Sequence, residues 1–128
     1  MSETAASRHP DIEIYVKSRG LEDICQWLNS TFSVVELQHS QGTVHQYRTG
    51  CGIPVLIHEK VSGKAWTSVW FDSDRTPWEK DLDCAVVASQ QMDTEIRCIA
   101  GGWNDGDDPD EWWKVVPGGE AAKMQWRT

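Results

Sequence analysis

The chain has 128 residues and carries 20 acidic against 12 basic side chains, which gives a net charge of −8 at pH 7. This length predicts one domain with an ordinary hydrophobic core, and the acidic balance argues against nucleic acid as a partner, because phosphate binding needs a basic face. With no apolar run long enough to span a membrane and no signal-peptide core, we expect a cytoplasmic protein that does not bind membranes.

The first half of the chain predicts one helix and four strands. Residues 1–10 are expected to be a disordered leader before a single domain at 11–128. Alternating apolar and polar side chains predict a half-buried strand at Asp11–Lys17, and an apolar stripe with helical spacing predicts a helix at Leu21–Ser30. Further strands are expected at Ser33–His39, Thr43–Arg48 and Ile53–Lys60, the first two joined as a hairpin.

A second run of elements begins with a strand that ends at Phe71. Its alternation places Trp66 and Trp70 on one face of that strand. The next strands are predicted at Thr94–Ala100, Glu111–Val116 and Glu120–Trp126, with the turn-rich segment Gly101–Asp110 as a loop.

Between the strand that ends at Phe71 and the strand at Thr94–Ala100 lies a predicted helix with a clear start signal. Thr76 is expected to be its N-cap, with Pro77 at the first helical position and Glu79 completing a capping box. The helix should end near Gln91.

The order strand, helix, strand, strand, strand thus occurs twice, over residues 11–60 and 64–126. We predict an α+β fold of two such βαβββ units, with a mainly antiparallel curved sheet and two helices packed on one side. This order, with Asp108-Pro109-Asp110 before the last strands, resembles the vicinal oxygen chelate superfamily, which includes glyoxalase I and bleomycin-binding proteins. Members of the superfamily often have an Asp-Pro-Asp-Gly turn at this point, and this chain has Glu111 in place of the glycine. The resemblance implies two curved sheets, each with its helix outside and a concave cleft inside.

The superfamily's enzymes hold a divalent metal with His, Gln or Glu side chains. The resemblance places the corresponding positions at Asp11, Trp66 and Val115. Tryptophan and valine do not bind metals, so a metal-dependent lyase or dioxygenase is only a third alternative. We predict no metal, no cofactor and no catalytic residues.

The histidines and cysteines give no strong signal for chemistry. His39 and His45 could face each other across the hairpin, where histidines are usually polar surface. Glu13, His58 and Glu59 could form another metal site, although a solvated strand face explains them more simply. The four cysteines are widely spaced and are expected to be free thiols.

The eight tryptophans exceed what we expect a core of this size to need. Our first hypothesis is a non-catalytic domain that binds a small aromatic or cationic ligand in a Trp-lined cleft. The alternative is an adaptor whose acidic, Trp-rich surface docks a basic protein. The residues predicted to bind are Trp66, Trp70, Trp103, Trp112, Trp113, Glu13 and Tyr15. A homodimer is also expected, because edge strands with exposed aromatic side chains favour self-association.

Overall fold

A computed structural model gives the structure of residues 11–100 and 111–126. The elements in chain order are β1 (Ile12–Lys17), α2 (Leu21–Phe32), β2 (Val35–Gln41), β3 (Val44–Thr49), β4 (Pro54–Ser62), β5 (Trp66–Phe71), α3 (Asp81–Met92), β6 (Ile96–Ile99), β7 (Glu111–Val115) and β8 (Ala122–Gln125). The described part of the chain therefore has an α+β fold, as predicted. Apart from the start of α3, each bound lies within two residues of its predicted position.

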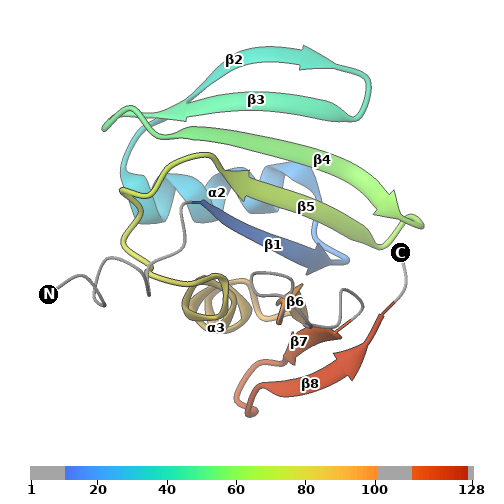
Figure 1. The fold of residues 1–128 in the computed structure, drawn as a ribbon. Coiled ribbons are helices and arrows are strands. Elements are labelled where there is room, and N and C mark those ends of the chain that lie inside the picture. The colour runs from blue at the N-terminus through green and yellow to red at the C-terminus, as the bar shows by residue number, and fades with distance from the viewer. Residues whose placement is uncertain (1–10, 101–110, 127–128) are drawn as a thin grey trace, which may run out of the picture.

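The eight described strands join one curved, unclosed sheet in the order β2-β3-β4-β5-β1-β6-β7-β8 (Figure 1). Every pairing between neighbours is antiparallel. The predicted antiparallel character is confirmed. The structure has a single sheet, however, where the resemblance to the vicinal oxygen chelate superfamily implied two.

The first strands of the two predicted units lie side by side at the centre of the sheet. Ile12 of β1 lies opposite Phe71 of β5, and Lys17 lies opposite Trp66. The other three strands of each unit follow the central pair in opposite chain order. In the first unit the last strand, β4, lies next to the centre, beside β5. In the second unit the second strand, β6, lies next to the centre, beside β1. The repeated order of elements therefore does not produce two halves of the same topology.

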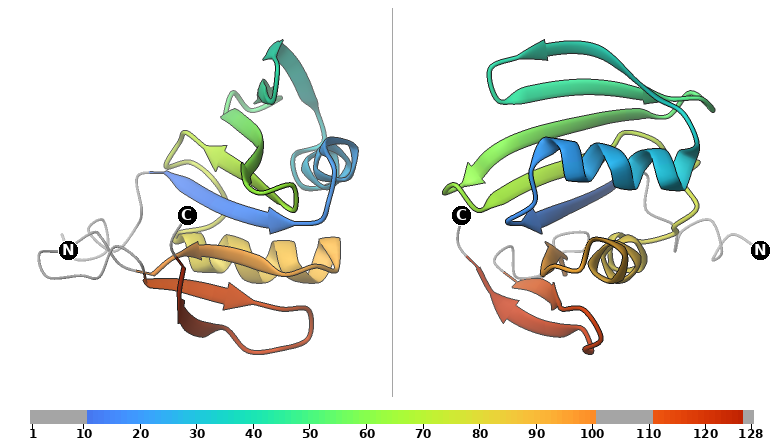
Figure 2. Two further views of the ribbon diagram at one scale, coloured as in Figure 1. Left: turned by 90° about the vertical axis from the view of Figure 1, so that its right-hand side faces the viewer. Right: turned by 180° about the vertical axis from the view of Figure 1, so that it is seen from behind.

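Both helices pack on one face of the sheet, which we call the helix side (Figure 2). Alternate residues of the central strands, such as Ile14 and Val69, are fully buried on this side. They pack against an apolar stripe of α2 that includes Leu28 and against the small buried residues Cys84 and Ala88 of α3. The opposite face, which neither helix covers, we call the helix-free face.

The predicted start of α3 is wrong. The helix begins at Asp81 after Lys80 as N-cap, with no side-chain cap hydrogen bond. Thr76 does not cap the helix; its hydroxyl donates to the Trp78 carbonyl at 2.9 Å. The Trp78 indole stacks on Trp27 at a ring separation of 5.9 Å in the core. The segment therefore turns inward to bury Trp78 before the helix can start.

The expected leader at 1–10 and the loop Gly101–Asp110, with Trp103, lie outside the described residues. Neither described helix has the length and apolar character needed to cross a membrane.

Candidate binding site

The structure brings together most of the residues predicted to bind a ligand. Trp113 lies on the helix side, because it pairs with the buried Cys98 and packs against the core. Trp112 then faces the opposite way, as expected for neighbours in a strand. The predicted residues on the helix-free face are Glu13, Tyr15, Trp66, Trp70 and Trp112. They divide into two groups with different surroundings.

The first group is a packed aromatic cluster formed by Tyr15, Trp66, Arg97, Trp112 and Trp126. Trp126 lies at its centre, with ring separations of 4.8 Å to Trp66, 4.9 Å to Trp112 and 5.5 Å to Tyr15. The Arg97 guanidinium lies 4.5 Å from the ring centres of both Trp66 and Trp126. Trp66 and Trp112 are each only 8% exposed. The rings of this aromatic cluster cover one another and leave little surface for a ligand.

The second group surrounds Trp70, and we call it the Trp70 site: Trp70, Asp11, Glu13 and Asp72. The Trp70 indole is half-buried, and its Nε1 donates to Oδ2 of Asp11 at 2.6 Å. Glu13 lies directly opposite Trp70 in the pairing of β1 with β5. Asp72 follows the end of β5 and is exposed. An indole with free surface therefore lies among three carboxylates.

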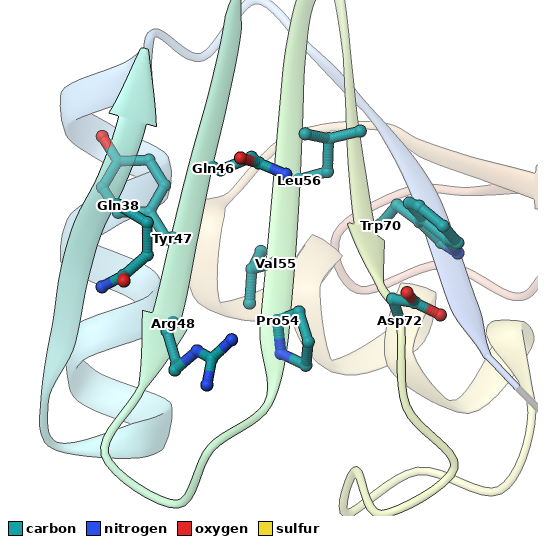
Figure 3. Close-up of a pocket in the computed structure, with 9 residues that line it drawn as sticks. All are labelled: Gln38, Gln46, Tyr47, Arg48, Pro54, Val55, Leu56, Trp70 and Asp72. Atoms are coloured by element: carbon teal, nitrogen blue, oxygen red, sulfur yellow. The ribbon is translucent and has the colours of Figure 1, made fainter.

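Trp70 and Asp72 also form one wall of a shallow depression of about 160 Å³. Figure 3 shows this depression, which crosses β3, β4 and β5 and has Arg48 on the side away from Trp70. Its lining residues are Gln38, Gln46, Tyr47, Arg48, Pro54, Val55, Leu56, Trp70 and Asp72. Sites for small molecules usually measure about 300–1,000 Å³, so this depression is suited to a single side chain rather than a larger ligand.

Glu13 carries a partly desolvated carboxyl group. Burial raises its pKa above the ordinary value; the hydrogen bond donated by Ser68 Oγ to Oε2 at 2.9 Å lowers the pKa, and nearby Asp11 raises it. No lysine or arginine among the described residues forms an ion pair with Glu13. A cation brought to this place would favour its charged form.

We expect the variant Glu13→Gln to gain stability relative to the native protein as the pH rises. The folded-state pKa of Glu13 is raised, so its contribution to stability is present below about pH 4.5 and is lost as the pH rises through the folded pKa. Glutamine cannot ionise and avoids this loss. Urea unfolding at pH 4 and pH 7 measures the difference, with Asp83→Asn correcting for the removal of one charge. The prediction would be contradicted if the free energy of unfolding of Glu13→Gln, relative to that of the native protein, stayed constant or fell as the pH rises.

Glu13, His58 and Glu59 do not form the metal site that the sequence left open as the less simple explanation. Glu59 lies on the helix side, where it bonds to His45, whereas His58 is exposed on the helix-free face. Within residues 11–100 and 111–126 no three metal-binding side chains gather. His39 and His45, which the sequence allowed to face each other across the hairpin, are not paired, because His39 lies opposite Gln46.

Sequence reasoning missed several members of this site. Asp11 and Asp72 flank strands and carry no motif, and their approach to Trp70 depends on the pairing of β1 with β5. Arg48 reaches the depression because β3 and β4 run alongside β5. The alternation of β3 and β4 predicts which of their side chains share a face. It indicates that Arg48 lies near Trp70 only if the strand order is known.

No protein-family model, curated protein or solved structure significantly matches this chain.

Proposed function

We propose that this protein is a protein-binding domain that docks a basic partner on its helix-free face through the Trp70 site. The observation that carries this proposal is the partly exposed Trp70 indole among the carboxylates of Asp11, Glu13 and Asp72, at the edge of a shallow depression. An arginine or lysine side chain of a partner could lie on the indole while its charge faces the carboxylates. Cation–π contacts of this kind contribute about 0.5–2 kcal/mol.

Two further features support a protein partner. The net charge of −8 attracts basic surfaces over long distances and accelerates their association. The depression has room for one side chain, and partly buried aromatic residues are common energetic centres of protein interfaces.

Replacing Trp70 with alanine should weaken binding of a basic probe at least tenfold, which corresponds to about 1.4 kcal/mol. The probe is a hexa-arginine peptide, and its affinity is measured by isothermal titration calorimetry at 50 mM salt. Binding should also weaken as salt is added, because charge attraction is screened. A Trp70→Ala protein that binds the peptide as tightly as the native one would contradict the proposal.

A charge-matched pair of variants separates the Trp70 site from the overall charge. Asp72→Asn and Asp83→Asn each remove one carboxylate, and Asp83 is exposed on α3, on the other side of the sheet. We expect Asp72→Asn to weaken binding of the peptide and Asp83→Asn to leave it nearly unchanged. Equal effects of both variants would show that only net charge matters.

A second candidate is the binding of a small aromatic or cationic molecule in the same depression. The depression favours it by combining an indole wall with one cationic and one anionic side chain, Arg48 and Asp72. Saturable quenching of tryptophan fluorescence by benzyltrimethylammonium, lost in Trp70→Ala, would support this candidate over the first.

The cytoplasmic location and the homodimer stay predictions. Val34, just before the edge strand β2, and Leu37, in its first half, are each more than half exposed. An exposed apolar edge of this kind favours self-association, so we place a contact between two copies at these two side chains, at the end of β2 that lies away from the hairpin loop.

A further inference from the structure

Three polar side chains lie in line on the neighbouring strands β2, β3 and β4, away from the Trp70 site. Oγ of Ser40 lies 2.6 Å from Nδ1 of His45, and Nε2 of His45 lies 2.8 Å from Oε1 of Glu59. The His45 side chain is 10% exposed, whereas Ser40 is exposed to solvent. A hydroxyl, an imidazole and a carboxylate are thus joined by two short hydrogen bonds, with the hydroxyl at the surface.

The partners of the ring fix the direction of both hydrogen bonds. A carboxylate only accepts, so for a neutral ring Nε2 of His45 carries the proton and donates to Glu59. Nδ1 is then the acceptor, and the Ser40 hydroxyl donates to it. This is the order of nucleophile, base and orienting acid found in serine hydrolases, with the two ring nitrogens exchanged.

The backbone holds the three residues in this arrangement. Ser40 and His45 are directly opposite in the hairpin, whose two-residue loop has Gly42 at a φ of 61°, a conformation that glycine adopts freely. The Glu59 N–H donates to the Thr43 carbonyl at 2.9 Å and ties this loop to β4. The line of side chains is therefore supported by rigid strands rather than by a loose loop.

We propose that Ser40 is a nucleophile for acyl transfer, activated by His45 and oriented through Glu59, with small esters as its class of substrate. In acylation, the Ser40 oxygen bonds to the ester carbonyl carbon, and its proton passes to Nδ1 of His45. The bond to the leaving alkoxide breaks, and Nδ1 returns the proton to the departing alcohol. Water then repeats these steps on the acyl-serine and releases a carboxylic acid.

The position of Ser40 makes it accessible to such a substrate. β2 is an edge of the described sheet. Gln41 and Val44 close the two-residue loop, so in the antiparallel ladder Ser40 and His45 form the next, non-hydrogen-bonded pair. The N–H of Ser40 therefore faces the free edge of the sheet and is available to an oxyanion formed near Oγ.

Reaction with a biotinylated fluorophosphonate tests this proposal, because phosphorus accepts the serine oxygen and fluoride leaves. We expect the native protein to be labelled, with the modified peptide containing Ser40 in mass spectrometry. Labelling should be lost in Ser40→Ala and slowed at least tenfold in Glu59→Gln, in line with the usual contribution of a base and its orienting group. Hydrolysis of p-nitrophenyl acetate should fall in the same order.

Ser30→Ala removes another exposed hydroxyl, on α2, and should be labelled like the native protein. Circular dichroism confirms that each variant is folded. Ser40 is exposed, so Ser40→Ala should fold like the native protein. This variant therefore tests the proposal even if changes at His45 or Glu59 unfold the protein. A native protein that is not labelled, or labelling that survives in Ser40→Ala, would overturn the proposal; Glu59→Gln labelled at the native rate would overturn the role of Glu59.

Discussion

Replacing Phe71 with alanine should lower the free energy of unfolding by about 3–5 kcal/mol. Phe71 is fully buried at the end of β5, and its ring lies 5.3 Å from Trp78, 5.8 Å from Phe32 and 6.3 Å from Trp27. These neighbours come from α2 and from the segment before α3, and they cannot move inward together to fill the space left by the ring. Urea unfolding followed by circular dichroism measures the loss.

Val86→Ala is the control for this measurement, because Val86 is an apolar side chain of α3 that is 37% exposed. We expect it to cost less than about 1 kcal/mol. A loss below about 1.5 kcal/mol for Phe71→Ala would show that the aromatic residues of the helix side pack less tightly than the ring distances indicate.

The second large effect is expected for Trp66→Ala, which should cost about 3 kcal/mol or more. The substitution removes the contact with Trp126 at 4.8 Å and one of the two rings that cover the Arg97 guanidinium. Trp70→Ala, on the same face of the same strand, should cost much less, because Trp70 is only half-buried. Thermal and urea unfolding of the two variants give this contrast directly.

A double-mutant cycle locates the origin of the effect. Trp66→Ala and Trp126→Ala should together cost less than the sum of the single changes, with a coupling of about 0.5–1.5 kcal/mol, as is usual for contacting aromatic rings. Additive losses would mean that Trp66 is stabilised by its burial alone and that the aromatic cluster does not act as a unit.

Much of the fold could be predicted because alternation and helical periodicity were strong. The alternation at Asp11–Lys17 predicted a strand with one buried face, and Ile12, Ile14 and Val16 form that face. The start of α3 could not be predicted from local signals. An N-cap contributes about 1 kcal/mol, whereas burial of a tryptophan such as Trp78 contributes several, so burial decided where the helix begins.

The candidate sites were harder to predict, because they depend on strand order and register. Asp11 and Trp70 are 59 residues apart, and no local pattern indicates that β1 lies beside β5. In the hairpin, a shift of one residue decides whether His45 faces His39 or Ser40. From the sequence, His39 was considered as the partner of His45, and the register identifies Ser40 instead.

The central place of β1 has a consequence for how the chain folds. Its two neighbours, β5 and β6, are synthesised long after it: Ile12 pairs with Phe71 and Val16 with Ile96. Closing such long loops costs entropy before any contact repays it, and proteins rich in non-local pairings fold slowly. A nascent chain that ends before β6 leaves one edge of β1 without its partner strand, so the whole sheet assembles only after most of the protein has left the ribosome.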